Sequence, residues 1–275
     1  MQERIQYTLH QAGENSSELK KVLDHYQNQP EKLKAARFLI ANIPAHRTYV
    51  GKEIDSLKQM KKESIQQGRI SDEIVTHWKS FDYSSSQVVK DIDVIKADIL
   101  IENIDLAFEA WEKRSWSKQY SFEDFCEYVL PYRIGDEPLE KWRRIYYERY
   151  SPVLDSLYQG NDVVEAARVM ANYLKEEGFT NHTDFNLPHL GALFLLENRV
   201  GYCRDNCDIA TYVMRSLGIP ITMDFYEITM ANGYFTNGYR DRIAYFDMFF
   251  RHVPNDGGFA IMAGVQQLIE YFDHL

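Results

Sequence analysis

The sequence has few cysteines and no cysteine-rich segment. Its 3 cysteines are spread over 275 residues, so they do not form a disulfide framework, and they fit a reducing compartment. Long apolar runs are also missing. None approaches the ~20 residues of a membrane-spanning helix, and residues 1–17 lack the apolar centre of a signal peptide. We therefore expect a cytoplasmic protein without a membrane span.

Clusters of positive charge are absent as well. Lys and Arg number 31 against 41 Asp and Glu, the net charge is −10, and the cations are interleaved with acidic residues as on solvated helix faces. Phosphate backbones and anionic lipids are bound by gathered Lys and Arg side chains. The charge pattern therefore excludes nucleic acid and anionic membrane surfaces as expected partners, and we expect no cofactor.

The apolar residues, 45% of the chain, suffice for a real core and follow helical spacing over most of its length. Residues 1–178 are expected to be almost entirely helical, with one helix before Pro30 and another ended by Pro44. The longest helix is expected over residues 86–116, where apolar residues recur at spacings of three and four.

Helix boundaries are marked by capping residues in the second half of this region. Ser121 followed by Asp124 is typical of a capping box. Pro152 predicts a kink or break in the helix around it, because proline lacks an amide donor. The Asn-Asp pair at 161–162 predicts the start of a helix that stops at Gly178.

The sharpest chemical feature is Cys203. Gly201 interrupts the chain just before a helix expected over residues 203–217, and Gly218 ends that helix. Cys203 would then lie in the first turn, where unpaired amides and the helix dipole favour a thiolate over a thiol. The alternative is that a small residue packs the start of the helix.

The pattern Gly201-x-Cys203-x-Asp205, followed by Met-Arg-Ser-Leu-Gly-Ile-Pro at 214–220, resembles the core of the transglutaminase-like superfamily. Three upstream segments resemble a bacterial subgroup, often exported lipoproteins, in which a helical domain precedes the cysteine core: 35–46, 121–143 and 190–203. The resemblance covers about residues 7–220. It implies a papain-type fold, Cys203 as nucleophile, a peptide or protein substrate, and acyl transfer or amide hydrolysis. It also implies that an upstream export signal could be missing.

Acyl transfer through cysteine requires a base and a group that orients it. In the family that residues 7–220 resemble, a His and then an Asp lie on the strands after Gly-Ile-Pro. The expected window, residues 230–245, contains no histidine. His252 is the candidate base that remains, against the alternative of a solvated histidine in a turn, and His274 lies at the end. The acyl-transfer machinery therefore looks incomplete, and we expect the chain to be inactive as written.

A Cys/His metal site is the other chemistry weighed for this region. Cys207 lies one turn after Cys203, and His182 and His189 lie upstream. Their spacings fit no common zinc motif, and a zinc site needs four converging ligands. We therefore expect no metal site. Cys126, in an amphipathic segment, is expected in the core.

The last fifty residues have a different character. Asp-x-Tyr-x-x-Thr-Met starting at Asp224, then two aromatic and glycine-rich motifs at 244–251 and 257–264, resemble the N-terminal region of nicotinate phosphoribosyltransferases over residues 223–275. The resemblance implies that Tyr226 and Thr229 help to form a nicotinate pocket in an enzyme of NAD biosynthesis. The alternative is that these aromatics fill a small core. The catalytic histidine and phosphoribosyl-pyrophosphate site of that family lie far downstream of this region.

The two resemblances predict a chimeric α+β chain. Its parts are a helical domain (1–178), a partial, truncated papain- or transglutaminase-like core (179–221) and a partial nicotinate phosphoribosyltransferase segment (222–275). The last part is expected to contain a hairpin of strands within 241–250 and 257–264 and a short closing helix, poorly docked on the rest. The predicted function is transglutaminase-like cysteine chemistry. The alternatives are a nicotinate phosphoribosyltransferase fragment and a non-catalytic helical interaction module.

Overall fold

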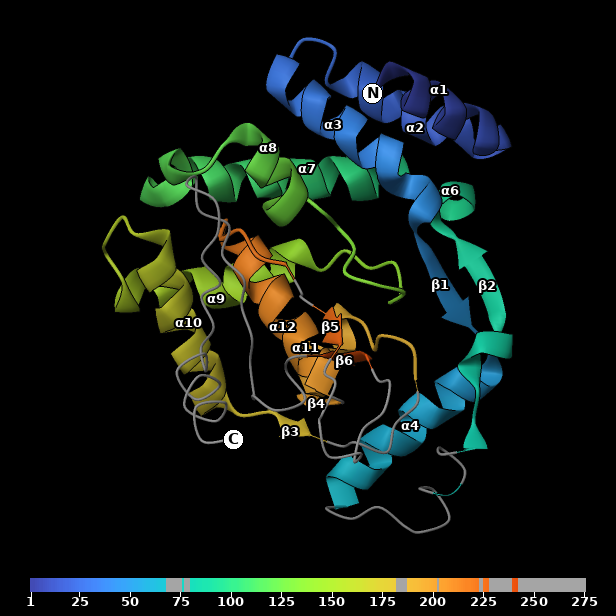
Figure 1. Cartoon of the computed structure of the whole chain (residues 1–275), viewed down its shortest axis with the longest axis vertical. Helices are drawn as coiled ribbons and strands as arrows, with labels where there is room; N and C mark the ends of the chain where they lie inside the picture. Colours follow the sequence, from blue (N-terminus) through green and yellow to red (C-terminus); the bar gives the residue numbers. More distant parts are fainter. Residues whose placement is uncertain are drawn as a thin grey trace.

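In a computed structural model of the chain, the described residues are 1–67, 76, 80–181, 187–201, 203–222, 225–227 and 239–241. Helices dominate this part of the chain, and each of its sheets has two strands (Figure 1). The predicted α+β class is confirmed in this coarse form. None of the helices in the described ranges is both long and apolar enough to cross a membrane.

The N-terminal helices form one end of the molecule, where the second and third pack on a long helix and the first packs on those two (Figure 1). They are α1 (Gln2–Gln11), α2 (Ser16–His25) and α3 (Pro30–Asn42), and the long helix is α7 (Ala97–Lys113). Leu19, Val22 and Tyr26 form the buried stripe of α2 and its end. The Tyr26 hydroxyl donates to the carbonyl of Ile101 at 3.0 Å, which fixes α2 to α7.

The prediction of a single long helix over residues 86–116 is wrong. The chain there forms β2 (Gln87–Lys90), the short helix α6 (Asp91–Val94) and then α7. β2 pairs antiparallel with β1 (Arg47–Val50). Two consecutive valines in β2 favour the extended chain, and the buried carboxylate of Asp91 holds the Arg133 side chain, so tertiary contacts interrupt the helical pattern.

The helices that follow confirm most of the predicted boundaries. Ser121 and Asp124 form a capping box at α8 (Phe122–Asp124), which continues as a π-helical turn, η5 (Phe125–Val129). Helix α9 (Arg143–Leu157) passes through Pro152. A break at this proline is therefore wrong, and the kink named with it stays a prediction. The Asp162 carboxylate caps α10 (Val163–Glu177), and Gly178 follows it with φ +80°. Helix α4 (Lys52–Gln67) and short 3-10 turns complete this part: η1 (Gly13–Asn15), η2 (Ile43–Ala45), η3 (Tyr83–Ser85) and η4 (Ser115–Gln119).

Helix α12 (Cys203–Ser216) lies in the middle of the molecule, as Figure 1 shows. It packs against α7, α9, α10 and α11 (Ala192–Asn198). Just before it, β4 (Val200–Gly201) pairs in parallel with β3 (Thr180–Asn181). Among the described strands, β4 is the one with a substantial contact to α12. The papain-type core stays a prediction.

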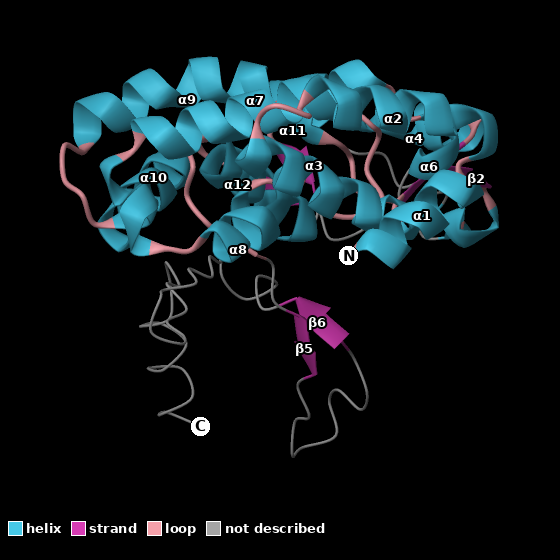
Figure 2. Ribbon diagram, turned by 90° about the horizontal axis from the view of Figure 1, so that it is seen from above, coloured by secondary structure: helices cyan, strands magenta, loops and turns pink. Residues whose placement is uncertain are grey.

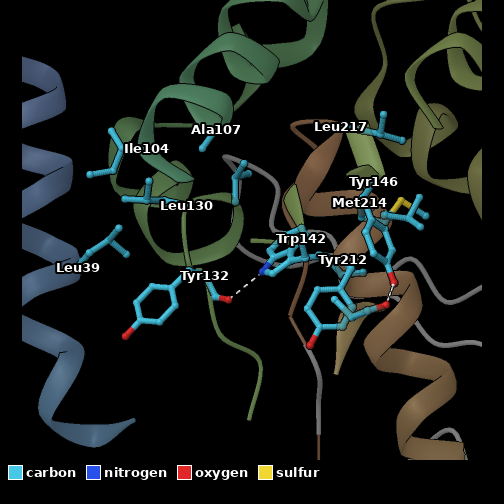
Figure 3. Packing of buried hydrophobic residues seen from close by; sticks show 14 of the residues in the cluster. Leu39, Ile104, Ala107, Leu130, Tyr132, Trp142, Tyr146, Tyr212, Met214 and Leu217 are labelled. Carbon is cyan, nitrogen blue, oxygen red and sulfur yellow. Dashed lines mark hydrogen bonds between the residues drawn. The ribbon is translucent and has the colours of Figure 1, made fainter. Parts of the chain in front are cut away.

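One hydrophobic core joins the N-terminal helices to α12. Its residues form one cluster in space, with Ile5 the first and Ile221 the last along the sequence. Residues on both sides of position 178 therefore share it. Figure 3 shows its centre, where Trp142 and Tyr146 of the α9 region pack beside Tyr212 of α12. The Tyr146 hydroxyl donates to the Ala192 carbonyl at 2.7 Å.

The end of α12 is fixed to the helical region. Gly218 has φ +71°, and its carbonyl accepts hydrogen bonds from the Trp116 indole at 3.2 Å and the Tyr120 hydroxyl at 2.8 Å. The Ile221 amide donates to the Tyr128 carbonyl at 3.3 Å. Ile221, 1% exposed, is the last residue of the described core.

Beyond the core, β5 (Phe225–Glu227) pairs antiparallel with β6 (Tyr239–Asp241). This pair lies outside the helical layer in Figure 2. The strands predicted within 241–250 and 257–264 and the closing helix at 265–275 lie outside the described residues, apart from Asp241.

Candidate functional site

Cys203 is the first residue of α12, two positions after Gly201, where β4 ends, as the sequence predicts. The side chain of Cys203 lies outside the described part of the structure. A Cβ atom at Gly201 would lie 2.5 Å from Cβ of Asp205, which is buried in the first turn of α12. The Gly-x-Cys-x-Asp pattern thus has a packing reason, because only glycine lets β4 approach this helix so closely.

A buried histidine and aspartate pair lies beside the start of α12. Nδ1 of His189 and Oδ2 of Asp208 are 2.6 Å apart, and the two side chains are 12% and 0% exposed. The His189 amide donates to Oδ1 of Asp136 at 2.8 Å. A Cβ atom at Gly135 would lie 2.5 Å from Nε2 of His189, so the ring packs against this glycine. The imidazole is therefore held from two sides.

The charge of this pair follows from its surroundings. Burial alone would lower the pKa of His189, but the charge of Asp208 and its hydrogen bond outweigh burial and raise that pKa to about 9. Arg204 opposes the rise and Glu137 adds to it. His189 is therefore protonated near neutral pH and forms an ion pair with Asp208.

The loop over residues 133–140 carries the groups that support His189. Both carboxylate oxygens of Glu137 accept backbone amides at 2.7 Å, from Ile134 and Gly135. The Arg133 guanidinium donates to the Glu137 carbonyl and, through Nε, to Asp91 at 2.7 Å. This loop has no regular structure, yet its buried polar groups are hydrogen bonded, which fixes its shape.

The same loop is locked to the segment that carries His189. Oε2 of Glu140 accepts the Leu193 amide at 3.0 Å near the start of α11. Gly191 has φ +94°, and a Cβ atom there would lie 3.0 Å from Pro138. Both the backbone conformation and the space at this contact require glycine.

Further charged groups surround the first turn of α12. Nη2 of Arg204 donates to the Leu187 carbonyl at 2.8 Å. From α4, Nζ of Lys58 donates to the Leu190 carbonyl at 3.3 Å. Lys61 is fully buried, and burial lowers its pKa to about 8 against the opposing effect of Asp205. Dense ionisable groups with shifted pKa values are typical of functional sites.

The Cys/His metal site that was weighed as an alternative for this region finds no support in the described residues. His189 lies against Asp208 rather than in a cluster with Cys207, which is buried within α12. His182, the other histidine weighed for such a site, lies outside the described residues. Within the described residues, no group of three or more His, Cys, Asp or Glu could hold a metal ion. Cys126 is a core residue, as predicted, and burial, with Glu123 and Glu127 nearby, raises the pKa of its thiol to about 12.

The remaining predicted site residues are not tested by the described geometry. Tyr226 lies in β5, where its backbone pairs with Arg240, and its side chain is outside the described part. Thr229 and His252 lie outside the described residues. Sequence reasoning missed the pairing of His189 with Asp208, because 19 residues and a loop separate them and no periodic pattern joins them.

Comparison with known proteins assigns a relationship to the end of the chain. A family model described as the nicotinate phosphoribosyltransferase (NAPRTase) N-terminal domain matches residues 221–275. The nicotinate phosphoribosyltransferase of Bacillus subtilis (strain 168) is 33% identical over 63 residues, which are 23% of this chain and 13% of that relative. The enzymes of Mus musculus and Homo sapiens are 42% and 37% identical over 52 and 57 residues. The match to the Mus musculus enzyme covers 19% of this chain and 10% of that relative. The match to the Homo sapiens enzyme covers 21% of this chain and 11% of that relative.

No solved structure matches this chain. The chain spans about an eighth of the length of its Bacillus subtilis relative. The resemblance of residues 7–220 to transglutaminase-like proteins stays a prediction. The match begins at residue 221, where the described hydrophobic core ends, and residues 221–275 carry nicotinate phosphoribosyltransferase-related sequence.

Proposed function

We propose that residues 221–275 bind nicotinate and so take part in NAD salvage. The observation that carries this proposal is the family match, which includes the Asp224-x-Tyr226-x-x-Thr229 motif. The chemistry is compatible, since a tyrosine ring offers a flat apolar face with a polar tip to an aromatic acid. The matched part is about a tenth of the mammalian relatives, so binding, rather than transfer of a phosphoribosyl group, is the activity to test.

Isothermal titration calorimetry of the full chain with nicotinate tests this proposal. We expect saturable heat, no comparable heat with nicotinamide, which lacks the carboxylate, and loss of the signal in Tyr226→Ala. Tyr226→Phe keeps the ring and should retain part of the affinity. Tyr7→Ala, at an exposed tyrosine remote in sequence, is the matched control. An absence of heat with the unaltered chain would rule out nicotinate binding.

Cysteine acyl transfer or amide hydrolysis through Cys203 is the second candidate function. It is favoured by one observation, the ion pair of His189 with Asp208, a residue of the helix that begins with Cys203. The test is residue-resolved alkylation of Cys203 by iodoacetamide across pH. A reactive cysteine should show a midpoint well below ~8.5, the ordinary value for a thiol. A midpoint at the ordinary value would count against this function.

A further inference from the structure

A groove of about 480 Å³ lies between α3 and the consecutive turns α8 and η5. Its volume is within the roughly 300–1,000 Å³ of small-molecule sites. The groove borders the end of α12, because the Ile221 amide donates to the Tyr128 carbonyl of η5. Cys203 begins that helix, whose 14 residues span about 21 Å. The groove is therefore separate from the groups around the first turn of α12.

Charged side chains of opposite sign line this groove from different elements. Lys34 and Arg37 come from α3, three positions apart, whereas Glu123 comes from α8 and Glu127 from η5. All four residues are exposed, and none of their side chains forms an ion pair or a hydrogen bond with another described residue. The two basic and the two acidic groups are thus available to a ligand.

Apolar side chains line the groove alongside these charges. Phe38 and Phe122 are half-buried, and both pack against the hydrophobic core. The Phe122 ring is held by Trp111 and Phe125, with ring centroids 6.0 and 5.9 Å away. Cys126 is buried and also lines the groove. The groove therefore offers a pre-formed apolar surface to a ligand.

The backbone on the acidic side has an unusual form. The capping box of Ser121 and Asp124 fixes the start of α8, and the chain then makes a π-helical turn in which the Leu130 amide donates to the Phe125 carbonyl at 2.9 Å. This turn carries Glu127 into the lining of the groove. Single π-helical turns are rare and occur frequently at functional sites.

We propose that this groove binds a short peptide of two or three residues that has free ends and an apolar side chain. The acidic pair receives the ammonium, the basic pair receives the carboxylate, and the two phenylalanine rings receive the side chain. A ligand with charge of one sign meets like charges on one side of the groove. A zwitterion meets opposite charges on both.

The separation of the charges favours a peptide over a free amino acid. The ends of an extended dipeptide or tripeptide lie ~7–11 Å apart, since each residue spans ~3.3–3.6 Å. Such a ligand reaches groups that are held on separate elements, whereas a free amino acid carries both charges on one residue. The site is proposed for binding alone, because burial, with Glu123 and Glu127 nearby, raises the pKa of the Cys126 thiol to about 12 and keeps it protonated.

Isothermal titration calorimetry of the full chain with related ligands tests the inference. The ligands are leucyl-phenylalanine, its N-acetyl derivative, which lacks the ammonium, its C-terminal amide, which lacks the carboxylate, and free phenylalanine. We expect saturable binding of leucyl-phenylalanine and a dissociation constant about fivefold higher for each blocked form, as for the loss of an exposed ion pair. Free phenylalanine should also bind more weakly than the dipeptide.

Charge variants at exposed positions assign each end of the ligand to its side of the groove. Arg37→Gln should weaken the binding of the free dipeptide about fivefold and leave the binding of its amide unchanged. Glu127→Gln should weaken the free dipeptide in the same way and leave the N-acetyl form unchanged. Lys20→Gln, at an exposed lysine of α2 outside the groove, is the matched control and should change neither.

Three results would overturn the proposal. The first is an absence of heat with the free dipeptide, and the second is equal affinity for its free and blocked forms. The third is a loss in Arg37→Gln that is as large for the amide as for the free dipeptide. Self-association of the chain that Arg37→Gln abolishes, without dipeptide binding, would assign the groove to a second copy of the chain instead.

Discussion

Gly135 leaves no room for a side chain beside the His189 ring. A Cβ atom there would lie 2.5 Å from Nε2, and the ring cannot withdraw without breaking its bond to Asp208. We predict that Gly135→Ala lowers the free energy of unfolding by ~1–3 kcal/mol, as overpacking does in a closed core. Urea denaturation followed by tryptophan fluorescence measures this change.

A double-mutant cycle provides the control for that prediction. In a His189→Ala background the ring is gone, so Gly135→Ala should lower the free energy of unfolding much less than it does in the unaltered chain. The two changes should then be coupled. Equal costs in the two backgrounds would show that the contact between Gly135 and the ring does not limit the packing there.

The ion pair of His189 and Asp208 gives stability a defined dependence on pH. The pKa of His189 is about 9 in the folded protein, against about 6.5 in an unfolded chain. A raised pKa contributes stability fully below pH 6.5, and this contribution is lost as pH rises through 9. We predict that the free energy of unfolding of the unaltered chain exceeds that of His189→Gln by about 3 kcal/mol at pH 6, and that this difference shrinks by pH 10. A constant difference across this range would contradict the ion pair.

At the scale of elements, Arg143 joins the ends of two helices. Its fully buried guanidinium donates to the Asn103 side chain at 2.9 Å. It also donates to two carbonyls: that of Arg215, near the end of α12, at 2.7 Å, and that of Val129, at the end of η5, at 2.9 Å. Burial, together with the charge of Arg215, lowers its pKa to about 9. A single side chain thus donates to backbone carbonyls near the ends of both helices.

The neighbouring arginine allows a matched comparison. We predict that Arg143→Met costs more than about 3 kcal/mol, because it leaves several buried carbonyls without donors. Arg144→Met should change stability by less than about 0.5 kcal/mol, since Arg144 is 54% exposed and its pair with Glu102 spans 3.5 Å. Similar unfolding midpoints in urea for the two variants would contradict the bridging role of Arg143.

Local signals in the sequence predicted the helix boundaries that are set by capping residues close to them in the sequence. Asp162, Gly178 and Gly218 mark helix ends in the structure as in the sequence, because a side-chain cap or a positive φ acts within a few residues. The expected helix over residues 86–116 failed, since pairing with β1 and the ion pair of Asp91 are distant in sequence.

The candidate site shows the same division between local and distant contacts. The start of α12 at Cys203 could be predicted from the glycine before it and the helical pattern after it. The partnership of His189 with Asp208 could not be predicted, because it depends on the loop over residues 133–140, where Asp136 accepts the His189 amide from 53 residues away in the sequence. The resemblance noted for residues 121–143 included this loop without indicating what its residues contact.

At the scale of the whole molecule, the core closes at Ile221. We predict that removing residues 222–275 leaves the urea unfolding midpoint of the helical part unchanged, because the core from Ile5 to Ile221 is built from helices that precede this segment. The 4 tryptophans all precede Ile221, so their fluorescence reports on this part alone. A large loss of stability on truncation would show that the last segment is integral to the helical unit.

The division of the chain into two parts is the central claim, and the joint itself tests it most directly. Trypsin cleaves after Arg215 and Arg240, so it releases residues 216–240 as one peptide that contains both Gly-Ile-Pro and Tyr226. We predict that mass spectrometry of cells that carry this protein detects this peptide alongside the flanking peptides 205–215 and 243–251. Consistent absence of the joining peptide beside abundant flanking peptides would show that the two parts belong to separate polypeptides.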